Sequence, residues 1–322
     1  MKKLTRRLVG LLPLAVMVLP WAANAQEYPA RPVKIVVPYP PGSSPDALAR
    51  IISEQLSRAI KQTVVVENKP GAGGMIGAKS VSEAAPDGST LLMYTPAWPA
   101  TKIFVKKPAI AVPEGLEPVT LVAEGRFAFV GSGALTASNF SELMAHAKAN
   151  PGKLNFATTG PGDALLYFET LKAEKEIRVE TIQYKGSSQY LTALMANEVQ
   201  LAFPPDYTTL PLVRDGKLKA YALTGDKRSN AFPNVPTFKE LGLPNIRGPW
   251  MALFAPRGTP AALVNKINAD LTAIIKSTDG GKRLQDISFE PVGSSAEQLR
   301  RRVQNDIEEW SVLAKKIGIE AE

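Results

Sequence analysis

The stretch Lys34-Ile-Val-Val-Pro-Tyr-Pro-Pro-Gly-Ser-Ser-Pro-Asp-Ala-Leu-Ala-Arg50 predicts a buried strand, a tight loop and the start of a helix. The β-branched run Ile35–Val37 is typical of a strand covered on both faces. The prolines and the glycine that follow end that strand. Ser44 suits the N-cap of a helix and Pro45 its first helical position. Apolar residues then recur at helical spacing as far as Ile60, so this helix has one face to bury.

A joint of this kind between strand and helix offers a place for an anion. The first backbone N–H groups of a helix lack partners, and the helix dipole makes that end partly positive. The small residues Gly42, Ser43 and Ser44 let a ligand come close. One interpretation is therefore a carboxylate held by main-chain N–H groups and serine hydroxyls. The other is an ordinary capped helix in an α/β sheet that binds nothing.

The chain begins with a secretory signal peptide. Lys2, Lys3, Arg6 and Arg7 are followed by the apolar run Leu8–Leu19 and by the small-residue site Ala23-Asn-Ala25. This pattern predicts export and cleavage after Ala25. The apolar run is too short to span a membrane comfortably. The protein is expected in the periplasm.

Composition excludes several functions for the 322-residue chain. The signal peptide carries four of the 38 Lys and Arg residues and none of the 30 acids, so the net charge of +8 falls to +4 in the mature chain. No basic run indicates nucleic-acid binding. There is no cysteine, and His146 is the only histidine, expected on the surface of a helix. Zinc sites and histidine-based catalytic triads are therefore not expected, and neither is any other metal site.

Strands and helices alternate along the chain in two blocks. This order predicts an α/β fold with parallel strands and helices on both faces of each sheet. Two crossing segments, near 124–126 and 247–250, would join the blocks as a hinge. We expect residues 26–125 plus 248–322 to form lobe 1 and residues 126–247 to form lobe 2.

Loops that follow the predicted strands carry the remaining candidate binding residues. Thr95–Trp98 leaves the third strand at the same sheet edge as the first loop, and this edge carries ligands in open α/β sheets. In the second block, Thr158–Asp163 and Lys185–Ser188 occupy equivalent places. The glycines of Gly71–Gly77 resemble a dinucleotide loop only weakly, since three residues separate them from the strand. No catalytic motif is found, and no cofactor is expected.

Many ordered motifs resemble the periplasmic solute-binding proteins of tripartite tricarboxylate transporters, the Bug family. They cover essentially the whole mature chain. The motifs are Tyr28-Pro-x-Arg-Pro32, Val36-Val-Pro-Tyr-Pro-Pro-Gly42 with Asp46, Val65-Val-Glu-Asn-Lys-Pro-Gly-Ala-Gly-Gly74, Ala85-Pro-Asp-Gly88, Pro118-Val-Thr-Leu-Val122, Tyr184-Lys-Gly186, Lys227-Arg-Ser229, Pro233-x-Val-Pro-Thr237, Glu240-x-Gly-Leu-Pro244 and Ala255-Pro-x-Gly-Thr-Pro260.

The resemblance implies a type II-like two-lobe periplasmic-binding-protein clamshell, each lobe a central mixed sheet flanked by helices. It further implies a monomeric, non-enzymatic receptor that closes on a small carboxylate and delivers it to a membrane permease. One carboxylate would sit at the Tyr39–Asp46 loop, and the rest of the ligand would reach the second lobe. The expected ligand-binding residues are Tyr39, Gly42, Ser43, Ser44, Asp46, Thr95, Ala97, Trp98, Phe127, Thr158, Thr159, Gly160, Asp163, Tyr184, Lys185, Gly186 and Asp206.

Three departures from the family pattern bear on the substrate. Ser43-Ser44-Pro45 stands where the first loop usually has Gly-x-Thr. Asp163 stands at a helix start where the family often has Thr or Ser, and an ionised Asp163 would repel a second carboxylate. Pro204 stands where the family tends to have Asp, and Asp206 comes two residues later. Aromatic residues lie near the predicted cleft loops: Tyr39, Trp98, Phe127, Tyr167, Phe168 and Tyr207.

Our hypothesis is a ligand with one carboxylate and an apolar or aromatic body. The simpler alternative is that several of these aromatic residues belong to the core and that Asp163 merely caps its helix. Other functions also remain open: a C4-dicarboxylate or citrate receptor of the same transport system, a sensor-input binding protein, or an exported enzyme on the same clamshell.

Overall fold

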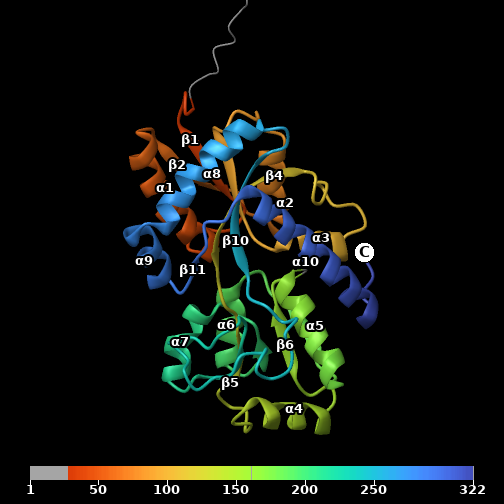
Figure 1. Ribbon diagram of the computed structural model, residues 1–322. Helices are drawn as coiled ribbons and strands as arrows, with labels where there is room; N and C mark the ends of the chain where they lie inside the picture. Colours follow the sequence, from red (N-terminus) through yellow and green to blue (C-terminus); the bar gives the residue numbers. More distant parts are fainter. Residues whose placement is uncertain (1–27, 161, 322) are drawn as a thin grey trace, which may run out of the picture.

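The computed structural model describes residues 28–160 and 162–321. The predicted signal peptide, residues 1–25, lies outside this range. The chain forms two α/β lobes, one above the other in Figure 1, and each lobe is built on a mixed β-sheet flanked by helices. Within the described residues, no helix has the length and apolar character needed to cross a membrane.

The sheet of the upper lobe has six strands in the order β11-β4-β10-β3-β1-β2. β1 pairs in parallel with β2 and β3, whereas β10 runs antiparallel to β3 and β4. This sheet is therefore mixed, because β10 returns to it from the far end of the chain. Its strands are β1 (Val33–Val37), β2 (Val64–Asn68), β3 (Thr90–Tyr94), β4 (Leu116–Glu124), β10 (Trp250–Pro256) and β11 (Glu290–Pro291).

Helices cover both faces of this sheet, so successive side chains of β1 from Ile35 to Val37, which point to opposite faces, are all buried. Ile35 and Val37 join the apolar cluster beneath α1 and α8, while Val36 joins the cluster on the opposite face with Leu92 and Trp250. The helices of this lobe are α1 (Ser44–Ile60), α2 (Met75–Ser82), α3 (Ala97–Phe104), α8 (Ala261–Lys276), α9 (Thr278–Asp286) and α10 (Ala296–Ile317), and a 3-10 turn, η1, spans Ala72–Gly74.

The sheet of the lower lobe has five strands in the order β7-β6-β8-β5-β9. β6 is parallel to β7 and β8, and β5 is antiparallel to β8 and β9. Its strands are β5 (Ala128–Ser132), β6 (Asn155–Thr158), β7 (Glu180–Gln183), β8 (Leu201–Ala202) and β9 (Leu218–Leu223), and its helices are α4 (Phe140–Ala149), α5 (Asp163–Lys175), α6 (Ser187–Met195) and α7 (Asp206–Arg214).

Most elements predicted from the sequence are present, but some details differ. The first helix is capped by Ser43, with Pro45 at the second helical position, so the predicted cap at Ser44 was one residue late. The predicted loop Thr95–Trp98 is only partly a loop, because α3 begins at Ala97. α7 contains Pro211, and α9 has two glycines and few apolar residues. Such sequences give weak helical signals, which is why the sequence did not predict these helices.

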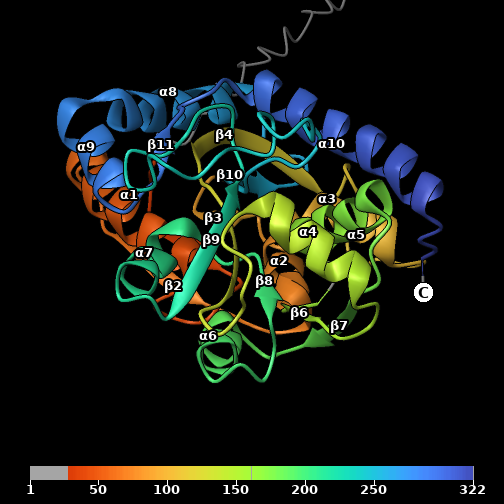
Figure 2. The same ribbon diagram turned by 90° about the horizontal axis from the view of Figure 1, so that it is seen from below.

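The C-terminal helix links the two lobes. Figure 2 shows α10 running along one side of the molecule beside α5. The ring of Trp310 on α10 meets the ring of Tyr167 on α5 edge to face at 6.3 Å, and Lys316 forms an ion pair of 2.7 Å with Glu174. The last part of the chain therefore belongs to the apolar core of the lower lobe as well as to the upper one.

Two glycines lie where the crossing segments pass each other. The N–H of Gly125 donates to the carbonyl of Pro249 at 2.8 Å, and a Cβ added at Gly248 would lie 2.2 Å from the carbonyl oxygen of Gly125. At Gly125 itself, a Cβ would lie 2.6 Å from the ring of Phe289. Close backbone approach therefore requires glycine at this crossing. The predicted lobe boundaries beside these residues stay a prediction.

Replacing Gly248 by alanine is expected to lower the free energy of unfolding by about 1–3 kcal/mol, because the added methyl group forces the two segments apart. Chemical denaturation measures this change. Gly242→Ala is the matched control, since a Cβ there meets nothing within 4 Å and only the backbone φ of +77° is strained. A loss at Gly248 no larger than the loss at Gly242 would contradict a close-packed crossing.

Candidate functional site

The N-terminus of α1 presents unpaired polar groups. Ala47 N–H makes the first intrahelical bond, to the carbonyl of Ser43 at 3.0 Å. Pro45 has no N–H, so Ser44 and Asp46 carry the backbone donors of this first turn that the helix leaves free. The Ser43 hydroxyl is buried and has no hydrogen-bond partner in the described part of the chain. This geometry suits a bound anion.

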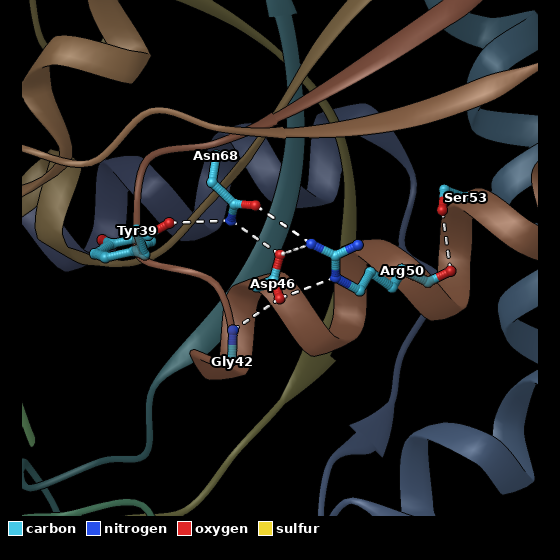
Figure 3. A network of polar contacts seen from close by, with 6 residues as sticks. All are labelled: Tyr39, Gly42, Asp46, Arg50, Ser53 and Asn68. Atoms are coloured by element: carbon cyan, nitrogen blue, oxygen red, sulfur yellow. Dashed lines mark hydrogen bonds and ion pairs between the residues drawn. The ribbon is translucent and has the colours of Figure 1, made fainter. Parts of the chain in front are cut away.

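Asp46 does not offer its carboxylate to this space, because the protein already satisfies it (Figure 3). Its side chain accepts hydrogen bonds from Gly42 N–H at 2.9 Å, from Asn68 Nδ2 at 2.9 Å and from two nitrogens of Arg50 at 3.0 Å. Asn68 also donates to the carbonyl of Tyr39 at 3.1 Å. Although burial raises the pKa of Asp46, these donors together lower it. Asp46 thus fixes the loop from Tyr39 to Gly42 against the end of β2.

The loop after β3 lies next to the loop after β1. The Tyr39 hydroxyl and Thr95 Oγ1 are 2.6 Å apart, and Thr95 Oγ1 accepts the N–H of Ala97 at 3.2 Å. Trp98 is fully buried, with its ring edge to face against Phe254 at 5.1 Å. Its Nε1 has no partner within the described residues. Tyr39 and Thr95 are partly exposed, whereas Trp98 is a core residue.

The first loops of the lower lobe are held by their own backbone. Thr158 Oγ1 accepts the N–H of Gly160 at 3.3 Å, and the N–H of Tyr184 donates to the carbonyl of Thr158 at 2.8 Å. Gly186 is the N-cap of α6. Thr159 and Lys185 are exposed. The neighbouring strands β6 and β7 therefore bring the 158–160 and 184–186 loops to one edge of the sheet.

Asp163 is a buried acid at the start of α5. The N-cap is Gly162 and makes no side-chain cap bond, so Asp163 is the first helical residue and not the cap. Its side chain is 9% exposed, and Oδ2 has no hydrogen-bond partner among the described residues. Burial raises the pKa of Asp163 to about 7, against the smaller effect of the backbone N–H groups at the helix start, and the charge of Asp306 adds to the rise.

Asp206 is a second buried acid, at the start of α7. It is 1% exposed, and neither carboxylate oxygen has a partner in the residues that the structure describes. Burial raises the pKa of Asp206 to about 6, although the nearby charge of Arg126 lowers it. Both α5 and α7 therefore begin with a buried aspartate that has at least one carboxylate oxygen without a hydrogen-bond partner among the described residues.

The two lobes touch each other through Tyr207. Its hydroxyl is hydrogen-bonded to Ser44 Oγ, and its ring lies 6.1 Å from that of Phe289. Tyr207 belongs to the lower lobe, and both of its partners belong to the upper one. The N-termini of α1 and α7 therefore face each other in this conformation.

The aromatic residues that the sequence placed near the predicted cleft loops divide into two groups by their burial. Tyr167 and Phe168 are buried in the lower-lobe core, where Phe168 stacks on Phe156 at 3.6 Å. Phe127 and Tyr207 stay partly exposed. For Tyr167, Phe168 and Trp98, the simpler interpretation as core residues therefore fits the structure better.

Sequence reasoning did not select Arg126 as a site residue. Its carbonyl accepts the N–H of Asp206 at 3.0 Å, and its Nε is buried without a hydrogen-bond partner in the described range. A cation at the end of the predicted crossing segment near 124–126 was the available signal. Nor did sequence reasoning indicate that Asn68 would hold Asp46, because these two residues meet only in the folded chain, whereas Arg50 lies four residues from Asp46 on the same helix.

Two α/β lobes closing on each other through opposed helix N-termini define a solute-binding protein. Residues 48–319 match the family described as "Tripartite tricarboxylate transporter family receptor" (TctC). The chain belongs to this family.

Relatives agree with this assignment. Protein BugT of Bordetella pertussis is 32% identical over 299 residues, which cover 92% of either chain. The structure of periplasmic binding protein BugD superposes with a TM-score of 0.82 at 32% identity, covering 92% of this chain and 100% of that one. R. palustris Rpa4515 with adipate superposes with a TM-score of 0.84 at 29% identity, with the same coverage. The two-lobe fold and the Bug-family resemblance predicted from the sequence are therefore confirmed.

Proposed function

We propose that this protein is a periplasmic receptor that captures a small monocarboxylate between its two lobes and delivers it to a tripartite tricarboxylate-type permease. The observation that carries the proposal is the start of α1, where the N–H groups of Ser44 and Asp46 and the buried hydroxyl of Ser43 are left without partners. A carboxylate there accepts these donors and meets the positive end of the helix dipole.

The opposite wall supports a single carboxylate. Asp163 and Asp206 are both buried with unpaired oxygens, and a second anionic group beside either of them would be repelled. The partly exposed rings of Tyr39, Phe127 and Tyr207 offer contacts for an apolar or aromatic body. The loops at Thr158–Gly160 and Tyr184–Gly186, with Thr95 and Ala97, complete the proposed binding surface.

The remaining parts of the proposal follow from the family and from the sequence. The receptor acts in the periplasm after cleavage behind Ala25, as a monomer, without cofactor and without catalysis. Ligand binding between lobes is coupled to their closure, because a ligand that contacts both walls favours the closed state over the open one.

A dicarboxylate receptor is the second candidate. The specific observation in its favour is the similar structure with adipate, which carries two carboxylates. On this alternative, the cation of Arg126 would hold the second carboxylate and Asp206 would be protonated. The two proposed functions differ in whether the protein binds monocarboxylates or dicarboxylates, so one ligand screen separates them.

The screen is a thermal-shift assay of the purified mature protein against aliphatic mono-, di- and tricarboxylates, aromatic acids and amino acids. A ligand that binds only the folded state adds about 2.7 kcal/mol at 100 times its dissociation constant. We expect a monocarboxylate to raise the melting temperature. A shift with dicarboxylates alone would replace the first candidate by the second, and turnover of a bound acid would overturn both.

The Ser43 hydroxyl provides the matched mutational test. Ser43→Ala is expected to weaken binding of the identified carboxylate about tenfold, because a hydrogen bond to a charged group is lost. Ser57→Ala is the control, since Ser57 lies on the same helix and donates to the carbonyl of Gln62 instead. Calorimetric affinities measure both. Equal affinities for the two variants would place the carboxylate away from the start of α1.

A further inference from the structure

The two lobes contact each other at two separate places. At one of them, Tyr207 on α7 of the lower lobe is hydrogen-bonded to Ser44 on α1 of the upper lobe. At the other, α10 runs beside α5, and the ring of Trp310 meets the ring of Tyr167. Figure 1 shows α7 on the left of the lower lobe and α5 on its right. The two contacts differ in their chemistry, so we expect them to respond differently when the lobes move.

The contact between α10 and α5 is made of core residues. Trp310 and Leu313 of α10 belong to the same apolar cluster as Tyr167 and the rest of the lower-lobe core, and Trp310 and Tyr167 are each 2% exposed. Earlier in the same helix, Leu299 and Val303 belong to an apolar cluster of the upper lobe. Separating α10 from α5 would expose buried apolar side chains to water, which the hydrophobic effect opposes. This helix therefore fixes the lobes to each other on its side.

The contact between Tyr207 and Ser44 is of the opposite kind. Both side chains are partly exposed, and the bond joins two hydroxyl groups. The ring of Tyr207 lies 6.1 Å from that of Phe289, at the margin of the upper-lobe core. When the lobes separate, water can replace each hydroxyl as the partner of the other, so the bond contributes only modestly to holding them together. This contact can break and form again while both lobes stay folded.

We propose that the lobes open and close about the contact between α10 and α5, the pivot, and that the bond between Tyr207 and Ser44 is a latch that favours the closed arrangement. The inference rests on the proposed function and names the residues that regulate it. Ser44 is the first residue of α1, so the latch closes beside the proposed carboxylate site. A latch that raises the closed fraction raises the affinity for any ligand that binds the closed arrangement, in proportion to that fraction.

Pulsed electron paramagnetic resonance on the purified protein without added ligand tests the proposal. The chain has no cysteine, so two introduced cysteines carry both spin labels. The first labelled pair, Ala59→Cys on α1 with Arg214→Cys on α7, reports the latch side. The second pair, Asn305→Cys on α10 with Ala173→Cys on α5, reports the pivot side. All four positions are exposed.

Removing the latch should change the first pair alone. Tyr207→Phe deletes the hydroxyl and keeps the ring, and we expect it to raise the ratio of longer to shorter distances in the first pair about fivefold. Ser44→Ala should do the same, and the two substitutions together should add nothing further. The second pair should keep one distance in every variant. Tyr221→Phe is the control, because its hydroxyl donates to the carbonyl of Ala137 within the lower lobe.

Each part of the inference can fail by itself. Distances in the first pair that stay the same in Tyr207→Phe would remove the latch. An effect of Tyr207→Phe that persists in full beside Ser44→Ala would show that Tyr207 acts through another group. Distances in the second pair that change as much as those in the first would remove the pivot. The proposed function fails separately, because these distances are measured without ligand and do not depend on which acids the thermal-shift screen finds.

Discussion

Replacing Asp46 by alanine is expected to lower the free energy of unfolding by about 1–3 kcal/mol, because it removes a buried carboxylate that accepts several hydrogen bonds and leaves their donors without that acceptor. Gly42 N–H, Asn68 Nδ2 and the guanidinium of Arg50 all lose their acceptor. The loop from Tyr39 to Gly42 would no longer be fixed, so carboxylate binding at the start of α1 should weaken as well. Chemical denaturation and calorimetry measure the two effects.

The control is Asp286→Ala, which breaks the exposed i,i+4 pair between Lys282 and Asp286. Exposed pairs of this kind contribute at most about 0.5 kcal/mol. The pH dependence gives a further check. The pKa of Asp46 is lowered in the folded state, so its stabilising effect is present above the unfolded pKa and is lost as the pH falls through the folded pKa. If Asp46→Ala were no more destabilising than Asp286→Ala, the network in Figure 3 would not hold the loop.

Asp163 is expected to have the opposite pH dependence. Its folded pKa is about 7, above the ordinary value of 3.8, so the unfolded chain loses its proton first as the pH rises. The ligand-free protein should therefore lose stability between about pH 4 and pH 7, by an amount of the order of 4 kcal/mol from this group. Asp163→Asn should remove that loss, so the variant should be more stable than the parent at pH 8 and similar to it at pH 4.

Urea denaturation at several pH values tests this expectation. Asp279→Asn is the control, because Asp279 lies in the first turn of α9 but is exposed. The Asp206 carboxyl, with a pKa raised to about 6, should leave a smaller slope of the same sign in the Asp163 variant. Parallel stability curves for the parent and for Asp163→Asn would show that burial does not raise the pKa of Asp163.

The sequence predicted the elements that local pattern determines. The β-branched run in β1, the proline and glycine loop after it, and the apolar stripe of α1 are each visible within about 30 residues. The cap of α4 is equally local, because the Asn139 side chain accepts the N–H of Glu142, three residues later, at 3.0 Å. The ordered family motifs indicated the two-lobe receptor fold, which the structural similarity to BugD confirms.

The candidate site was predictable as a set of loops but not as a set of contacts. The edge of the sheet, and hence the loops at Tyr39–Asp46, Thr95–Trp98 and Thr158–Asp163, follows from the alternation of strands and helices. The alternation of strands and helices does not tell whether a side chain in one of these loops faces the ligand or the core. Asp46 and Asp163 both lie in the first turn of a helix, yet one has a full set of donors and the other has an unpaired oxygen.

The sequence by itself determined the fold class and predicted the end of each lobe at which a ligand would bind, because strand, loop and helix signals depend on neighbouring residues. Only the tertiary structure decided which polar groups are paired. Asn68 meets Asp46 through the packing of α1 beside β2, and Tyr207 meets Ser44 through the contact of one lobe with the other. Hydrogen bonding and burial depend on such distant neighbours, and these two properties separate a structural carboxylate from one that is free for a ligand.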